Sequence, residues 1–266
     1  MKKFVNDPKQ FVPEMLKGIA LANPDTITYV PEYNLIMRAD APNNDKVSIV
    51  QGSGSGHEPA HVMVVGPGML DAACPGDVFA APPSDYVYET AKLVASDKGV
   101  LLLVNNYTGD RMAFEMAQEL ADADGIKVDT LFINDDVAVQ DSTWTVGRRG
   151  VAGNFFVIKC CGAKAEQGAS LEEIAAIGEK VNSVTRTMGI ALTVHPAGQG
   201  QSAVRARRGR DGGRRRHSRR ARTASRQAGQ RHRRRRTARR GRARPAVSKR
   251  RPGGPDDQRP RRHPDQ

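Results

Sequence analysis

Apolar and polar positions follow one another along the first 190 residues in blocks that favour helices and strands in turn. Helical spacing of apolar residues predicts helices over 8–22, 84–97, 111–124, 154–165 and 170–187. Apolar or alternating runs predict strands over 26–30, 35–38, 46–51, 100–104, 128–133 and 188–193. Because strands alternate with helices, we expect an α/β fold with a mixed, mostly parallel sheet flanked by helices.

A glycine-rich loop, Gly52-Ser53-Gly54-Ser55-Gly56, follows the predicted strand 46–51 and leads into His57-Glu58-Pro59. Alternate glycines allow a sharp turn and a close approach of backbone N–H groups to a ligand. Open α/β sheets bind ligands at the carboxyl ends of their parallel strands. The loop lacks the G-x-G-x-x-G pattern and the Lys-Ser/Thr pair of a P-loop, so it does not indicate a nucleotide site.

A second polar loop, Asn105-Asn106-Tyr107-Thr108-Gly109-Asp110, follows the predicted strand 100–104. If the two strands are neighbours, His57 and Asp110 face one pocket. An imidazole and a carboxylate there could bind the hydroxyl groups of a small polyol and move protons. The competing interpretation has equal weight: His57 caps the following helix, and Asp110 caps its own.

Six other polar residues have a structural interpretation beside a functional one. His61 lies one turn after His57 and could line the same side, but core packing is the favoured interpretation. We expect Glu58 to be stabilised by a helix dipole. Asp135-Asp136 could bind a cation, but a solvated turn is the favoured interpretation. Arg148-Arg149 could hold a phosphate group or form a structural salt bridge, and the sequence does not decide between these roles.

Charge divides the chain at about residue 200. Residues 1–200 carry 16 Lys and Arg against 25 Asp and Glu, a net charge of −9, whereas residues 201–266 carry 26 against 4, a net charge of +22. The basic segment contains no Leu, Ile, Phe, Tyr, Trp or Met, so it cannot bury enough apolar surface to fold. We therefore expect a domain over 1–193 and a disordered basic tail over 194–266. Its charge predicts salt-dependent, nonspecific polyanion binding without base stacking.

Composition also limits the classes of site and location. The three cysteines, Cys74, Cys160 and Cys161, show neither paired metal spacing nor the even count of a disulfide framework. No apolar run approaches the roughly 20 residues of a membrane span. No apolar leader follows Lys2 and Lys3. We expect a cytoplasmic protein with no metal site and no membrane segment.

Several motifs in order resemble the dihydroxyacetone (glycerone) kinase K subunit: G-S-G-S-G-H-E-P, M-L-D-A-A-C-P-G-D-V-F, N-Y-T-G-D, D-D-V-A-V and G-R-R-G-V-A. The resemblance runs from about Met1 to Thr193. It implies a homodimeric, cytoplasmic kinase subunit of glycerol metabolism that presents dihydroxyacetone for phosphorylation. It also implies no cofactor in this chain, because a partner L subunit or domain holds the phosphate donor, ADP or ATP with magnesium.

The resemblance assigns roles to individual residues. Many relatives carry Lys where this chain has Asn105, so a ketotetrose such as erythrulose is an alternative substrate. A non-catalytic, ketose-binding or regulatory relative is a further alternative. The catalytic residues implied are His57 and Asp110, with Asp110 as the base for the accepting hydroxyl. The ketose-binding residues implied are Gly54, Ser55, Gly56, His57, Asn105 and Asp110.

The family carries a second histidine in a later G-V-G-I-H-G-E-P-G segment, where it forms a covalent hemiaminal with the ketone. This sequence contains no such segment, and His195 and His217 lie in different surroundings. Permitted codons for Val204–Thr223, read one base over, encode F-A-L-G-E-D-E-M-E-V-G-V-G-I-H-G-E-P-G. We therefore interpret the tail as a frameshift product that truncates the domain, and we expect impaired activity.

Overall fold

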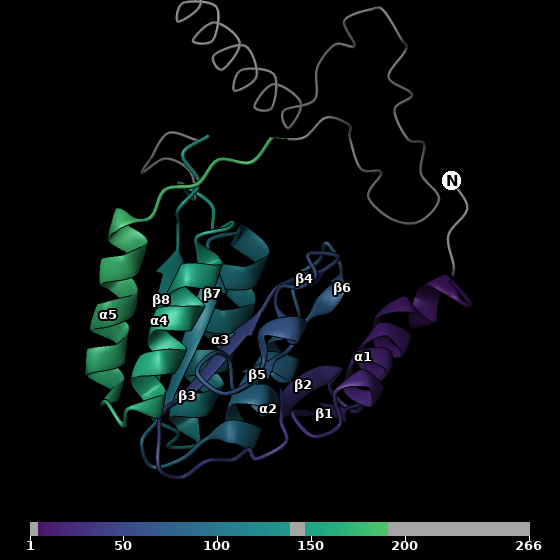
Figure 1. Ribbon diagram of the computed structural model, residues 1–266, viewed down its shortest axis with the longest axis horizontal. Coiled ribbons are helices and arrows are strands. Elements are labelled where there is room, and N and C mark those ends of the chain that lie inside the picture. The colour runs from purple at the N-terminus through teal and green to yellow at the C-terminus, as the bar shows by residue number, and fades with distance from the viewer. Residues whose placement is uncertain (1–4, 139–146, 191–266) are drawn as a thin grey trace, which may run out of the picture. The chain divides into compact units, whose positions relative to one another are not determined.

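The computed structural model describes residues 5–138 and 147–190 (Figure 1). The predicted tail over 194–266 and the end of the predicted strand 188–193 lie outside these ranges. The helices are η1 (Pro8–Gln10), α1 (Phe11–Ala22), η2 (Val62–Val64), α2 (Ser84–Val94), α3 (Thr108–Ala123), α4 (Asn154–Glu166) and α5 (Leu171–Val184). The strands are β1 (Ile27–Val30), β2 (Leu35–Arg38), β3 (Ser48–Gly52), β4 (Gly54–Ser55), β5 (Ala72–Ala73), β6 (Gly76–Val78), β7 (Val100–Asn105) and β8 (Val128–Ile133).

The main sheet has the strand order β1-β2-β5-β3-β7-β8. Strands β5, β3, β7 and β8 run parallel, whereas β1 and β2 form an antiparallel hairpin and β2 pairs antiparallel with β5. The predicted mixed, mostly parallel sheet with flanking helices is confirmed. Since β3 lies between β5 and β7, the strand order reverses at β3, and open α/β sheets bind ligands at such a reversal.

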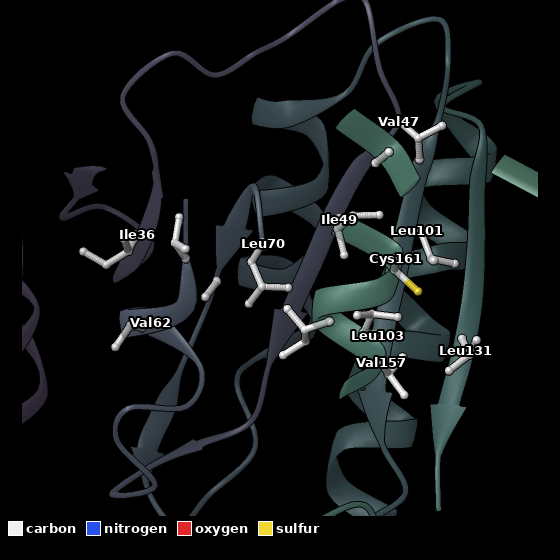
Figure 2. Close-up of a cluster of buried hydrophobic side chains, with 14 of the residues drawn as sticks. Ile36, Val47, Ile49, Val62, Leu70, Leu101, Leu103, Leu131, Val157 and Cys161 are labelled. Atoms are coloured by element: carbon white, nitrogen blue, oxygen red, sulfur yellow. The ribbon is translucent and has the colours of Figure 1, made fainter. Parts of the chain in front are cut away.

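Helices cover both faces of the central strands, as the continuous apolar run of β7 predicts. Successive residues of a strand point to opposite faces. Leu101 and Leu103 therefore belong to the core cluster that contains side chains of α1, α4 and α5. Leu102 and Val104 belong to the cluster that contains side chains of α2 and α3. Figure 2 shows the first cluster, in which Val157 of α4 lies beside Leu103.

The glycine-rich loop continues beyond β3 as β4, which pairs in parallel with β6 in a separate two-stranded sheet. A Cβ on Gly54 would lie 2.6 Å from the backbone nitrogen of Ala80, and one on Gly52 would lie 2.2 Å from the carbonyl oxygen of Cys74. Of the three loop glycines, only Gly56 has a positive φ, 96°. The alternate glycines therefore allow two backbone segments to pack closely, a role that the sequence analysis did not predict.

A buried ion cluster joins β2, the start of β3, the start of β5 and the end of α4. Asp71 accepts hydrogen bonds from Lys46 Nζ at 2.6 and 2.7 Å and from the backbone N–H of Ile49 at 2.8 Å. Arg38 Nη1 lies 3.2 Å from Asp71 Oδ1 and also pairs with Glu166. Because Arg38, Lys46 and Asp71 are buried, removing one of these charges would leave another without its partner. The cluster thus fixes how these elements meet.

Several predicted boundaries differ from the structure. Helix α2 ends at Val94 rather than 97, and α5 ends at Val184 rather than 187. The predicted strand over 188–193 is wrong for residues 188–190, which have no strand pairing. Pairing stops at Thr187, whose N–H donates to the carbonyl oxygen of Asp135 and whose carbonyl oxygen accepts from Val137. Within the described ranges, no helix is long and apolar enough to cross a membrane.

Candidate functional site

A cavity of about 690 Å³ lies where the residues following β3 and β7 emerge from the sheet. Its wall combines the glycine-rich loop and the turn after it, the segment after β6, the loop from β7 into α3, and the start of α4. The volume lies within the usual range of ligand pockets, roughly 300–1,000 Å³. The polar side chains that line it belong to Ser53, His57, His61, Asn105, Tyr107, Asp110 and Asn154.

Parallel pairing of β3 with β7 brings the two polar loops together. Gly52 pairs with Val104 in the register, so the residues that follow the two strands emerge at the same edge of the sheet. Ser53 Oγ donates a hydrogen bond to Asp110 Oδ2 at 3.1 Å, which links one loop to the other. His57 and Asp110 line the same cavity, in the arrangement expected from neighbouring strand ends.

Asp110 is a buried carboxylate that uses only part of its hydrogen-bonding capacity. The residue is 4% exposed, and its Oδ1 has no hydrogen-bond partner among the described residues. Burial raises the pKa of Asp110 from 3.8 to about 6, and the hydrogen bond from Ser53 opposes this rise. Asp110 is therefore ionised at pH 7 but more basic than an ordinary aspartate, which suits a group that accepts a proton. Among the described residues, the hydrogen bond of the Asp110 side chain is to Ser53, so the interpretation of Asp110 as a helix cap is not supported.

His57 and Glu58 follow the glycine-rich loop. His57 is exposed, lines the cavity and packs against Phe79, with 5.3 Å between the ring centroids. The sequence predicts a helix dipole next to Glu58, but the carboxylate instead accepts hydrogen bonds from the N–H of Gly56 at 3.1 and 3.2 Å. Because turn residues rather than an α-helix come next, the helix-dipole interpretation of Glu58 and the capping interpretation of His57 are both wrong.

Ser55 and Gly56 do not line the cavity. Ser55 is buried, and its hydroxyl donates to the carbonyl oxygen of Gly76 at 2.6 Å, which holds β4 against β6. The N–H of Gly56 is bound by the nearby Glu58 carboxylate rather than left open toward a ligand. The predicted site residues that the cavity brings together are Gly54, His57, Asn105 and Asp110.

Asn105 ends β7 and contributes a second unpaired oxygen to the cavity wall. The residue is buried, and its Oδ1 has no hydrogen-bond partner within the described part of the chain. A Cβ on Gly150 would lie 2.9 Å from this oxygen and 2.7 Å from the carbonyl oxygen of Ile133. Glycine at position 150 thus allows the loop before α4 to approach Asn105 closely.

The loop before α4 is held by Asp135, which is fully buried. Its carboxylate accepts hydrogen bonds from the N–H groups of Val151 and Gly153, each at 2.9 Å, and from the hydroxyl of Thr187. The prediction of a solvated turn is therefore wrong for Asp135. These bonds join residues that are distant in the sequence, so the Asp135-Asp136 pair alone gives no sign of them.

Arg149 forms no salt bridge with the residues that the structure describes, whereas the phosphate role of Arg148-Arg149 stays a prediction. Its Nη1 donates to the carbonyl oxygen of Gly147 at 2.9 Å, and its guanidinium carbon lies 5.6 Å from the centre of the Tyr107 ring. Arg149 is thus held by a backbone carbonyl and an aromatic ring. Among the residues that the structure describes, no group of three His, Cys, Asp or Glu side chains could hold a metal ion.

Four polar cavity residues were not among the predicted site residues, namely Ser53, His61, Tyr107 and Asn154. His61, expected in the core, is 2% exposed but also lines the cavity. Ser53 belongs to the glycine-rich loop and binds Asp110 directly. Asn154 begins α4 and reaches the cavity from a distant part of the sequence. Only the polar character of Asn154 at the start of an apolar helix could have suggested its role.

Comparison with known proteins identifies the family of this chain. The family model described as the Dak1 domain matches residues 17–208. The chain belongs to this family. One curated relative is the dihydroxyacetone-binding subunit DhaK of PTS-dependent dihydroxyacetone kinase 1 from Listeria innocua. It is 52% identical over 193 residues, which cover 73% of this chain and 58% of the relative. The chain thus spans less than two thirds of the length of that relative.

Solved structures confirm the fold. The native dihydroxyacetone kinase of C. freundii matches with a TM-score of 0.71 and 36% identity, over 76% of this chain and 38% of that chain. D-Erythrulose kinase from Mycolicibacterium smegmatis is 39% identical over 192 residues, covering 72% of this chain and 33% of the relative. The dihydroxyacetone kinase operon co-activator Dha-DhaQ matches with a TM-score of 0.59 and 38% identity, over 63% of this chain and 51% of that chain. The chain is therefore similar both to kinases and to a co-activator.

We expect Asp110→Asn to stabilise the domain at pH 7 although it removes a proposed site residue. The ionised carboxylate opposes folding because its pKa in the folded state, about 6, exceeds the ordinary 3.8. A shift of one pKa unit corresponds to about 1.4 kcal/mol, so the gain should be roughly 1–3 kcal/mol. It should be present above pH 6 and fall toward zero near pH 4, where Asp110 becomes protonated in both states. Urea unfolding at several pH values measures this, and a loss of stability at pH 7 would contradict it.

Proposed function

We propose that this chain is the ketose-binding component of a dihydroxyacetone kinase. It binds dihydroxyacetone in the cavity beside the ends of β3 and β7 and presents it for phosphorylation by an L subunit or domain. The L partner carries the phosphate donor, ADP or ATP with magnesium. The chain acts in the cytoplasm as part of a homodimer, in glycerol metabolism. The names of the kinase relatives support this assignment.

One observation carries the proposal: an unpaired, buried carboxylate oxygen lies in the same cavity as an exposed imidazole. Asp110 Oδ1 has no partner among the described residues, and His57 lines the cavity with it. Buried hydrogen-bond acceptors rarely lack a donor. A ligand that carries a hydrogen-bond donor would therefore satisfy this oxygen. A ketose hydroxyl is such a donor, and its hydrogen bond to a carboxylate is of the stronger, charge-assisted kind.

The chemistry follows from the basicity of Asp110. The carboxylate accepts the proton as the O–H bond of the ketose hydroxyl breaks. The hydroxyl oxygen of the ketose then forms the new bond to the incoming phosphorus atom. The bond between phosphorus and the donor nucleotide breaks, and the electron pair remains on the donor. Since burial places the pKa of Asp110 at about 6, the base is available at neutral pH and still holds the proton better than an ordinary aspartate.

We predict that Asp110→Asn weakens dihydroxyacetone binding by roughly 10–100-fold, because a hydrogen bond to a charged group contributes about 1.5–3 kcal/mol. His57→Ala should weaken it by about tenfold. Isothermal titration of the full chain measures both effects. Glu115→Gln is the control, since it alters an exposed ion pair with Arg111 on α3 and should leave the affinity unchanged. Unchanged affinity in Asp110→Asn would contradict the proposal.

Erythrulose is the alternative ketose, and Asn105 is the residue that favours it. The side chain lines the cavity with an unpaired oxygen, and a relative of 39% identity is a D-erythrulose kinase. The asparagine side chain is shorter than that of lysine and leaves more room for the fourth carbon of erythrulose. We predict that Asn105→Lys lowers the affinity for erythrulose relative to dihydroxyacetone by about tenfold. Titration of each ketose into the wild-type chain and into the Asn105→Lys chain measures the ratio of the two affinities. An unchanged ratio excludes Asn105 as the residue that determines ketose preference.

A non-catalytic, regulatory role is the second candidate function, because a co-activator shares the fold. A chain with this role would bind the ketose with the same residues but transfer no phosphate. Phosphorylation assays with a matched L partner separate the two functions. Ketose binding without product formation would favour the regulatory role, provided that the same L partner is active with an intact K subunit.

We also propose that the basic tail is a frameshift product and that its loss of the hemiaminal-forming histidine impairs activity. The abrupt change to a net charge of +22 over residues 201–266 supports this interpretation. Nonspecific polyanion binding by the tail is then a by-product of its charge. We expect the coding DNA beyond Thr193 to encode a G-V-G-I-H-G-E-P-G segment in another frame. Nucleotide sequencing checks this, and the absence of that segment from every frame would exclude the frameshift.

A further inference from the structure

His61 combines burial with a place in the cavity wall. It follows His57 by four residues and is 2% exposed, whereas His57 is exposed. Both histidines line the same cavity. His61 Nε2 has no hydrogen-bond partner among the described residues, although it is buried. A role in core packing alone leaves this nitrogen unexplained, because buried polar atoms normally have a partner.

The other ring nitrogen of His61 belongs to a chain of buried amides. His61 Nδ1 lies 2.7 Å from Gln51 Oε1, and Gln51 Nε2 donates to Asn154 Oδ1 at 2.5 Å. Since the NH₂ group of Gln51 faces Asn154, its oxygen faces His61 and can only accept. His61 Nδ1 must therefore carry the hydrogen. Asn154 Nδ2 lies 3.5 Å from the same nitrogen, a long separation that suits two groups that both carry hydrogen.

This arrangement determines whether His61 Nε2 donates or accepts a hydrogen bond. Burial, with a further contribution from His57, lowers the pKa of His61 to about 3, so the imidazole is neutral at pH 7. A neutral imidazole has one N–H group and one bare nitrogen. Because Nδ1 carries the hydrogen, Nε2 is a hydrogen-bond acceptor in the wall of the cavity.

Besides Asn105 Oδ1, the described cavity wall therefore contains two unpaired acceptors of different charge, the Asp110 carboxylate oxygen and His61 Nε2. A ligand that satisfies both needs two donors, and dihydroxyacetone carries one hydroxyl at each end of a three-carbon chain. We propose that His61 is a substrate-positioning residue, whose Nε2 accepts a hydrogen bond from the ketose hydroxyl that is not phosphorylated, in a tautomer fixed by Gln51 and Asn154. This inference rests on the proposed function and adds the residue that orients the second hydroxyl.

Hydroxyacetone tests the proposal, because it lacks one of the two hydroxyl groups. In isothermal titration, the full wild-type chain should bind dihydroxyacetone about tenfold more tightly than hydroxyacetone, the larger end of what one hydrogen bond contributes. His61→Phe removes the acceptor and should bring the ratio of the two affinities close to one. His61→Gln supplies an oxygen acceptor and should restore part of the preference. A purely structural role would weaken both ligands equally and keep the ratio.

Phe155→Leu is the matched control, since Phe155 lines the cavity, is exposed, and offers no hydrogen bond. It should change both affinities by a similar factor and retain the wild-type ratio. An unchanged ratio in a folded His61→Phe chain would overturn the inference while leaving the proposed function intact. Binding of neither ketose by the wild-type chain would overturn the proposed function and this inference with it.

Histidine ¹⁵N NMR of the wild-type chain tests the inference even if the His61 variants fail to fold. We expect the His61 ring to carry its hydrogen on Nδ1 at pH 7, with Nε2 unprotonated. Dihydroxyacetone should shift the Nε2 signal, whereas hydroxyacetone should shift it much less. A hydrogen on Nε2, or equal responses to the two ketones, would overturn the assignment.

Discussion

The site depends on the parallel pairing of β3 with β7. Both strands are buried, and the pairing is continuous from Ser48 with Val100 to Gly52 with Val104. Because the two strands end level with each other, Ser53 comes within hydrogen-bonding distance of Asp110 at the start of α3. A shift of two residues along the strands would preserve which side chains face each core but would separate these loops by about 7 Å. The register therefore determines the chemistry as well as the packing.

The cavity retains polar atoms that cost stability. The unpaired buried atoms among its described residues are Asn105 Oδ1, Asp110 Oδ1 and His61 Nε2. Each would gain a partner from a hydroxyl donor, and none is needed to hold the sheet together. Elsewhere in the domain, the buried carboxylate of Asp71 is paired, because it is bound by Lys46 and Arg38. On the proposed function, this contrast distinguishes charged groups that stabilise the fold from polar groups that bind the ligand.

Sequence patterns predicted the parts of this fold that depend on local periodicity. The apolar run of β7 and the helical spacing of apolar residues over 170–187 both identify real elements. Strands β4, β5 and β6 have two or three residues each, too few to show a periodicity. The roles of Asp135 and Asn154 come from hydrogen bonds across long stretches of sequence. Local patterns therefore located the strand ends, and tertiary contacts decided which polar side chains meet there.

Recognition of a ketose has two parts, and the described cavity is suited to one of them. On the proposed function, the acceptors Asp110 and His61 recognise the two hydroxyl groups, which a ketose shares with a polyol. The carbonyl group distinguishes the ketose, and the resemblance assigns its capture to a histidine in a segment that this sequence lacks. Hydroxyl recognition arises from the ends of β3 and β7 and their neighbours, whereas carbonyl recognition requires a different segment. A chain with this domain alone should therefore bind by hydroxyl pattern and discriminate weakly between ketone and alcohol.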